Sequence, residues 1–335
     1  MTVIRTNQQN QVAIWGETVL GTRPTPVSKA QRIALIGHDL GRTQSLATSQ
    51  VLRGDPNLAQ PPRGRYHAES HKISVPIERN MIGLLLYKMF PSYGVAGAAD
   101  PYTHTMKLVP GAWHAAGPFF GIEVWDTEAG KGDVLDGNAI IGVECDVSTD
   151  DKEATLTFEV AGIAKGDWEN AVRQQASPTT YTDSYFNMAD VRVKIDGALS
   201  TMVVGAKFAL KRRASVKYFN DGNRFAGQVI IGGVETASVN LTALFDDAAT
   251  VKTLATGELE HSIEFLFNHP TNVNHSLSFL FPEVQCYLSN VGAVGSGNER
   301  EITVDGTSYY QDGPNATSCL VTLKNPLTTY VGLMQ

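Results

Sequence analysis

The sequence is poor in the features on which metal-binding, membrane-spanning and secreted proteins usually depend. Its three cysteines, Cys145, Cys286 and Cys319, stand far apart with no Cys-x-x-Cys pair. This spacing argues against a disulfide frame or a zinc site and predicts small buried side chains in a reducing compartment. No apolar run approaches the roughly 20 residues of a membrane-spanning helix, and the longest, residues 81–90, contains Lys88. An apolar N-terminal segment is also missing, so we expect no signal peptide.

Composition and charge narrow the function classes. With 335 residues, 42% of them hydrophobic, the chain can bury a core as one large domain or two ordinary ones. The 31 glycines predict many turns and therefore many short strands. The net charge of -7 disfavours a protein that grips nucleic acid, because phosphate binding needs Lys and Arg. It does not disfavour a protein that lets nucleic acid pass by.

Catalytic and cofactor motifs are missing as well. We find no phosphate-binding loop, no Gly-x-Gly-x-x-Gly and no Gly-x-Ser-x-Gly. His67 and His71 would lie on one face of a strand with Glu69 between them, which allows a metal site, but a surface-facing polar strand edge is the preferred interpretation. A catalytic carboxylate pair of the glycosidase type stays an open alternative, because the two residues of such a pair come together in the fold and not in the sequence. We therefore expect no enzyme, no cofactor and no bound metal.

The order of predicted elements indicates a mainly β protein. Alternating segments such as residues 138–148 and 153–163 predict antiparallel strands. Met81, Leu84, Leu85 and Lys88 at helical spacing predict a helix, which Pro91 ends. A second helix is expected over residues 242–256, ended by Gly257.

This order of elements occurs twice along the chain. Strand, strand, helix and then four strands recur, with His104 aligned on His261 and Cys145 on Cys286. A long period of this kind indicates duplicated units, although unrelated β proteins also share such an order. We predict an extended arm over residues 1–30 and two similar antiparallel β-sandwich or barrel-like lobes, each with one packed α-helix, over residues 31–175 and 185–335.

The strand pair in the first lobe has a distinct polar face. Val143, Cys145 and Val147 alternate with Glu144, Asp146 and Ser148, and Glu159 follows the same rule on the next strand. Such alternation buries one face and leaves an acidic, hydroxyl-rich face in water. It favours either an ordinary solvated surface or a negatively charged wall.

Two segments near the N-terminus resemble a known family. Residues 12–26, VAIWGETVLGTRPTP, present spaced Trp, Gly, Glu, Thr and Pro, and TSQVLRGDPNL with RGRY follows. The residues that carry the pattern are Trp15, Gly16, Glu17, Gly21, Thr22, Pro24, Pro26, Leu52, Arg53 and Asp55. Together they resemble the N-terminal region of tail tube (major tail) proteins from long-tailed, siphovirus-type bacteriophages. The resemblance is local, and a duplicated lobe departs from the simplest members, which have one lobe per chain.

The resemblance implies a structural subunit that polymerises into stacked rings around a channel for DNA ejection. Two lobes per chain would make a trimeric, pseudo-sixfold ring, with a hexameric ring as the alternative. Trp15, Glu17 and Arg23 would be arm contacts to the adjacent ring, and Glu144, Asp146 and Glu159 a candidate acidic lumen face. DNA would pass without specific binding. Terminator, tip and tape measure proteins would meet the tube, which is a part of the virion tail assembled in the host bacterial cytoplasm.

The loop spelled VLRGDPNLAQPPRG separates two strands that a short turn joins in the second lobe. Its prolines deny it ladder hydrogen bonds and favour a projecting tip. We interpret it as an inter-ring contact through Arg53, Asp55, Asn57, Arg63 and Arg65, with the Arg-Gly-Asp triplet a coincidence of spelling. The alternatives are a carbohydrate-binding or depolymerising phage tail protein, and a capsid decoration or adhesin module in which that triplet would act.

Overall fold

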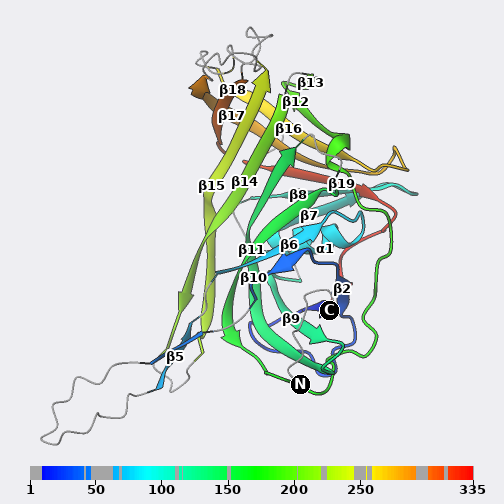
Figure 1. Cartoon of the computed structure of the whole chain (residues 1–335), viewed down its shortest axis with the longest axis vertical. Helices are drawn as coiled ribbons and strands as arrows, with labels where there is room; N and C mark the ends of the chain where they lie inside the picture. The colour runs from blue at the N-terminus through cyan, green and yellow to red at the C-terminus, as the bar shows by residue number, and fades with distance from the viewer. Residues whose placement is uncertain are drawn as a thin grey trace, which may run out of the picture.

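Strands account for most of the structure. The computed structural model describes residues 10–40, 43–46, 63–67, 70–109, 113–114, 116–148, 152–201, 203–219, 225–244, 254, 259–291, 301–312 and 316–334. It is 58% strand and 5% helical, and all its strand ladders are antiparallel, so the predicted mainly β class is confirmed. Figure 1 shows long strands crossing the molecule and a single labelled helix among them.

The elements have the following bounds. The first half holds β1 (Asn10–Gly16), β2 (Gln31–Ile33), β3 (Gly37–His38), β4 (Thr43–Leu46), β5 (Arg63–His67), β6 (Ser70–Pro76), α1 (Met81–Met89), β7 (Ser92–Ala96), β8 (Tyr102–Lys107), β9 (Phe119–Asp126), β10 (Lys131–Ser148) and β11 (Thr155–Lys165). The second half holds a short 3-10 helix (Met188–Asp190), β12 (Val191–Ile195), β13 (Ala198–Leu199), β14 (Val203–Lys217), β15 (Gln228–Leu244), β16 (His261–Asn268), β17 (Ser276–Val291), β18 (Glu301–Ser308) and β19 (Leu320–Asn325).

Strand pairing follows the same order twice. The first ladder runs β1–β9–β10–β11–β6–β3. The second ladder runs β12–β16–β17–β18–β15–β14. In both ladders the strand that comes first in the chain pairs with the third-last strand in chain order, and the second and third strands pair with each other at the far edge. The backbone thus repeats a unit that the sequence shows only faintly.

The two ladders are joined into one sheet system. Residues 142–148 of β10 pair with residues 211–205 of β14, which links the first ladder to the second. β19 lies between β17 and β8 and makes a further link. The main hydrophobic core contains residues from both halves of the chain. The halves are therefore packed against each other and not merely tethered.

Several predicted elements differ from the structure. Residues 275–282 and 283–291, expected as two strands, form the single strand β17, because Pro282 sits at a register shift where no ladder hydrogen bond is needed. The match of His104 with His261 is wrong, since β8 pairs with β7 and β19 whereas β16 is the counterpart of β9. Residues 242–244 of the expected second helix belong to β15; Leu254 is helical, and the rest of that segment lies outside the described residues.

The expected arm of residues 1–30 contains β1. This strand pairs along its whole length with β9 and also with β2. Its apolar side chains Val12 and Ile14 belong to the main core. The part of the arm described from Asn10 onward is thus built into the sheet of its own chain, while residues 1–9 lie outside the described residues.

Helix α1 is buried on every side. It begins beyond Glu78, whose carboxylate accepts hydrogen bonds from the backbone N–H groups of Asn80 and Met81, and it ends before Pro91. The predicted helix is confirmed. Lys88 is 1% exposed, and its ammonium donates to the carbonyls of Ala116, Gly117 and Phe119 at 3.0–3.2 Å. In the part of the chain that is described, no helix is long and apolar enough to cross a membrane.

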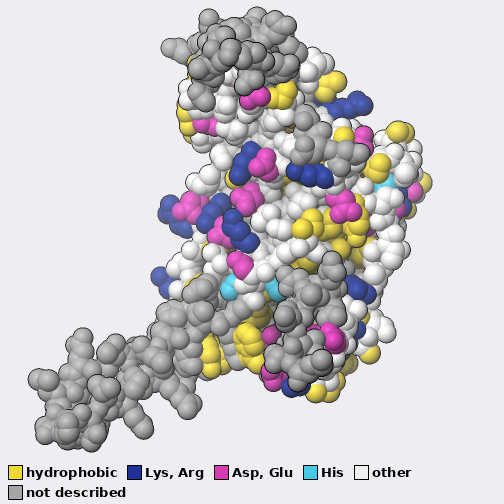
Figure 2. Space-filling model, in the orientation of Figure 1, with side chains coloured by type: hydrophobic (Ala, Val, Ile, Leu, Met, Phe, Trp, Pro, Cys, Tyr) yellow, Lys and Arg dark blue, Asp and Glu magenta, His cyan; other side chains and the backbone are white. Residues whose placement is uncertain are grey.

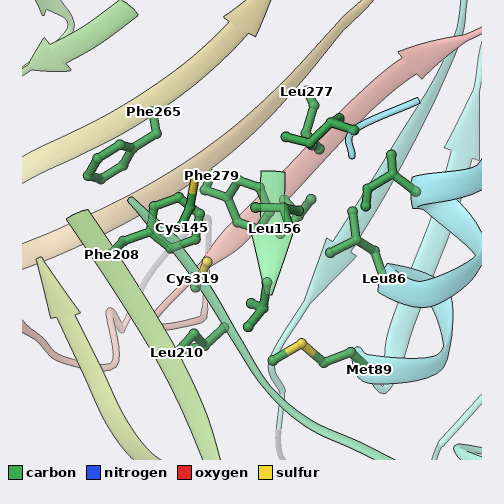
Figure 3. Close-up of a cluster of buried hydrophobic side chains, with 14 of the residues drawn as sticks. Leu86, Met89, Cys145, Leu156, Phe208, Leu210, Phe265, Leu277, Phe279 and Cys319 are labelled. Carbon is green, nitrogen blue, oxygen red and sulfur yellow. The ribbon is translucent and has the colours of Figure 1, made fainter. Parts of the chain in front are cut away.

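Aromatic side chains of the second ladder fill the space between the ladders. The ring of Phe208 lies 4.6 Å from that of Phe279 and 4.9 Å from that of Phe265. Figure 3 shows these rings beside Cys145 and Leu156 of the first ladder, with Leu86 and Met89 of α1 facing them. All three cysteines are buried and unpaired with one another, as predicted.

We expect Gly83 to be indispensable for the packing of α1. A Cβ added there would overlap the phenol ring of Tyr330, which is fully buried and donates its hydroxyl to the Asn80 carbonyl at 2.9 Å. Gly83→Ala should lower the free energy of unfolding by about 1–3 kcal/mol, because a well-packed core resists added volume. Denaturant unfolding measures this. Gly94→Ala, where an added Cβ meets nothing within 4 Å, is the matched control and should change little. Equal effects of the two substitutions would contradict the expectation.

Candidate functional site

The described residues offer little that suits catalysis. No group of three His, Cys, Asp or Glu side chains among them could hold a metal ion. A cavity of about 880 Å³ is lined mainly by β15, with residues of other segments such as Arg212 and Trp113, and its one carboxylate is Glu235. In this lining, the guanidinium of Arg212 donates hydrogen bonds to the Met89 and Gly232 carbonyls and lies over the Trp113 ring. His71 is 9% exposed and points one ring nitrogen at the Asp39 carbonyl, so the preferred interpretation of a surface-facing polar strand is wrong for this residue.

A polar sheet face is the most extensive feature. The predicted alternation on β10 and β11 is confirmed: Val143, Cys145 and Val147 are buried, as are Leu156, Phe158 and Val160. The side chains between them point to the opposite, solvent-facing side of the sheet. We call this side the mixed-charge face and define it by Lys72 of β6, Glu144 and Asp146 of β10, Thr157 and Glu159 of β11, and Lys207 and Lys211 of β14.

Lysines balance the carboxylates on the mixed-charge face. The Lys72 ammonium lies 2.9 Å from Glu144, and the Lys211 ammonium lies 2.9 Å from Glu159. Asp146 is directly opposite Lys207 in the pairing of β10 with β14. The hydrogen bond and charge of Glu144 raise the pKa of Lys72. The surface predicted to be acidic is thus mixed in charge, because its lysines arrive from β6 and β14, strands remote in sequence from the acidic hairpin.

These lysines were missed, although a signal existed. In β14, Phe208 and Leu210 are buried, so Lys207 and Lys211 must share the other face. What the sequence could not supply was the neighbour of that strand. Only the pairing of β14 with β10 places the lysines beside Glu144 and Asp146.

The polar face continues onto the second ladder without a break. Across β14, β15 and β18 the register aligns Lys207 with Asn240 and Asp305, and Ala209 with Ser238 and Thr307. Asn240 donates its amide to Asp305. Figure 2 shows Lys, Arg, Asp and Glu side chains interspersed over the region where β14 and β15 lie in Figure 1. One polar surface therefore spans both halves of the chain.

The three predicted arm residues are engaged inside their own chain. Trp15 is 1% exposed and packs in a small core. Arg23 forms a two-pronged ion pair with Asp136 at 2.7 and 3.1 Å and also reaches Asp167 at 2.9 Å. Glu17 is 1% exposed and accepts from the N–H groups of Gly21 and Gly137 at 2.8 and 3.1 Å. Trp15 and Glu17 thus have no free surface for a neighbouring ring.

The predicted inter-ring loop is described only at its base. Arg53, Asp55 and Asn57 lie outside the described residues, and Arg63 and Arg65 belong to β5, of which the backbone is described. The β4–β5 hairpin lies beside the turn end of β14–β15 (Figure 1). There the ring of Tyr66 stacks on Phe225 at 4.9 Å, and the Tyr218 hydroxyl donates to the Tyr66 carbonyl at 2.6 Å. The two hairpins therefore lie at the same end of the molecule.

Glu17 should make the stability of the protein depend on pH. Burial raises its pKa from 4.5 to about 7, against the opposing effect of the backbone donors. Between these values the folded state holds a proton that the unfolded chain releases, so the free energy of unfolding falls as pH rises from about 4.5 to about 7. Glu17→Gln should flatten this slope, by up to about 3 kcal/mol over the interval.

Urea unfolding across that pH interval measures the effect. Glu128→Gln, at an exposed position, is the matched control and should keep the wild-type slope. A Glu17→Gln slope equal to that of the wild type would contradict the assignment.

Comparison with known proteins agrees with this architecture. A family model described as phage tail tube protein matches residues 7–308. No curated protein matches the chain. The family match covers most of the sequence, far beyond the N-terminal segments in which the resemblance was noticed. The chain therefore belongs to the phage tail tube protein family and is a structural subunit of a phage tail tube.

Proposed function

We propose that the mixed-charge face and its continuation on the second ladder line the channel through which DNA passes. The observation that carries this proposal is the continuity of one polar face across β6, β11, β10, β14, β15 and β18. A wall built from several subunits needs such a face, with the apolar side of the sheet turned into each subunit.

The charge pattern suits passage and not binding. Protein binding to DNA draws affinity from free cations that neutralise phosphates and release counterions. On this face two of the lysines are held by carboxylates of the same face, and the third lies opposite Asp146. Glu144, Asp146 and Glu159 are thus lumen residues in this proposal, where they keep the lysines from acting as phosphate ligands.

The repeated ladder supports the proposed ring composition. We assign one tube lobe to residues 31–175, with β1 of the preceding arm completing its sheet, and one to residues 185–335. Three chains then supply six lobes, a trimeric ring with a pseudo-sixfold channel. The subunit acts without catalytic residues, assembles in the host cytoplasm and meets terminator, tip and tape measure proteins at the tube.

The carbohydrate-binding alternative finds no support. Sugars stack on exposed aromatic faces, yet Trp15 is buried and the faces of Trp113 and Trp125 are covered by Arg212 at 4.7 Å and Arg173 at 5.1 Å. Aromatic side chains do remain exposed, among them Trp168, Tyr287 and Tyr309, but the family match supports the tube subunit and not a glycan-binding protein.

Electron microscopy tests the channel assignment. The concentrated protein should form long hollow tubes, with three chains in each averaged ring. Tubes of Asp146→Cys labelled with a maleimide-gold cluster should carry gold on the channel wall, since the native cysteines are buried and poorly reactive. Val273→Cys, at a loop position that is 90% exposed, is the control and should place gold at a different radius. Gold from Asp146→Cys on the outer surface, or six full chains per ring, would contradict the proposal.

The loop of residues 51–64, with Arg53, Asp55, Asn57, Arg63 and its neighbour Arg65, is proposed as the inter-ring contact, supported by its prolines, its charges and the position of its base beside the second hairpin. Replacing residues 55–63 with a tight turn should leave the subunit folded, because the core lies elsewhere, but unable to stack. Circular dichroism checks the fold and microscopy checks the tubes. Normal tubes from this deletion would show that the loop has another role.

A further inference from the structure

β17 and β3, which belong to the two ladders, each have an edge with no partner among the described residues. β17 is 16 residues long, but β16, of 8 residues, pairs with it only as far as Val284. Beyond that point residues 285–291 pair with β18 on one side and with no described residue on the other. β3 pairs with β6 through Gly37 and Ser74, and its second edge likewise has no partner among the described residues. Unpaired backbone edges of this kind are sites for pairing with another chain.

The first ladder contains an equivalent edge that is paired within the chain. There β10 is 18 residues long and β9 only 8, so β9 leaves the same edge of β10 free from Gly142 onward. β14 takes that edge over residues 142–148. β14 is the outermost strand of the second ladder, as β3 is of the first. The open edge of β17 and the open edge of β3 are therefore the counterparts of two edges that already pair within the chain.

Transverse rows of residues fix the register of this correspondence. In the first ladder the directly opposed residues are Glu144, Thr157, Ser74 and Gly37. In the second they are Gln285, Thr307, Ser238 and Ala209. The two rows share Thr and Ser at the inner steps and have Glu against Gln and Gly against Ala at the ends, and they agree with the alignment of Cys145 on Cys286. Glu144 is opposite Ala209 at the join between the ladders.

From this repetition we infer that residues 285–291 of β17 pair antiparallel with β3 of a second copy of the chain, with Gln285 opposite Gly37. This inference rests on the proposed function, because it describes the contact that closes the ring. The occupant is a second copy, since the same chain supplies both matching edges and already pairs their counterparts.

Burial at the two places supports the inference independently. At the join, Val147 is 8% exposed and Phe208 is fully buried. Their counterparts at the open edges are Leu288, 41% exposed, and Ile36, 56% exposed. The apolar side chains that are buried where β10 pairs with β14 therefore have exposed counterparts at the two open edges, where the second copy would lie. Pairing across subunits would bury them as the join does.

The contact is head-to-tail and therefore closes rings only if its rotation does. The β10–β14 pairing within the chain and the proposed β17–β3 pairing between chains would relate each lobe to the next one by the same rotation. The polar row then runs from Gly37 to Gln285 in each subunit and continues into Gly37 of the next. Main-chain hydrogen bonds would carry the contact, as in other strand additions.

Site-directed cross-linking tests the pairing. Gly37→Cys with Gln285→Cys in one chain, treated with a short bismaleimide after tube assembly, should give covalent species of two and three chains. The residue at 37 has room, because an added Cβ meets nothing within 4 Å. Glu144→Cys with Ala209→Cys is the matched control and should cross-link only within a chain. Each single variant should give no cross-linked ladder.

If the cysteine variant fails to assemble, amide hydrogen exchange of the wild-type chain in tubes and in free subunits tests the same pairing. Residues 285–291 and the segment around β3 should exchange more slowly in tubes than in free subunits, whereas residues 142–148 should be protected in both. Tubes without cross-links above the single variants, or without slower exchange at both edges, would overturn the pairing and leave the tube function intact. Failure of the wild-type chain to form tubes would count against the proposed function itself.

Discussion

The structure depends on the need of every strand edge for a hydrogen-bonding partner. β10 continues past its shorter neighbour β9, and β17 continues past its shorter neighbour β16, so each has a length of edge that needs another partner. For β10 the cover is β14, from the other half of the same chain. That pairing joins the two ladders and places Phe208 of β14 directly opposite Cys145 of β10. It also extends the polar face from one half to the other.

The same pairing sets the electrostatics. Strand alternation places charges on one side of each strand, but only neighbouring strands decide which charges meet. Because β14 and β6 flank the acidic hairpin, lysines fall beside Glu144, Asp146 and Glu159. A wall of this kind presents hydrogen-bonding groups and little free charge of either sign. Such a surface neither holds a phosphate backbone nor repels it strongly enough to hinder entry, and this balance suits a conduit.

Local patterns made some of this predictable from the sequence. Period-two alternation identified the buried faces of β10 and β11, and helical spacing with Pro91 identified α1. Contacts between distant segments were out of reach. Trp15 and Glu17 lie in a motif that resembles an arm, yet β9 receives β1 and buries both. Pro282 suggested a strand end, whereas β17 carries it through at a bulge. The repeat was visible, but His104 was aligned on the wrong strand because β8 and β9 are both short and apolar on one face.

The proposed two-lobe organisation has a physical consequence for assembly. A chain with one lobe must find a partner for every open edge, and each contact costs the translational and rotational freedom of a whole subunit. In this chain, half of the equivalent edges are satisfied during folding, when β10 meets β14. The loss of translational and rotational freedom on association is then incurred once for every two lobes. The two copies of the unit are also free to diverge, and the described residues show that they have: the outermost strand is the fifteen-residue β14 in one ladder and the two-residue β3 in the other. A short, glycine-bearing edge offers few backbone groups to unwanted partners before assembly, while the long edge of β17 supplies the template. In the proposed assembly, this asymmetry brings the short edge of β3 against the long edge of β17.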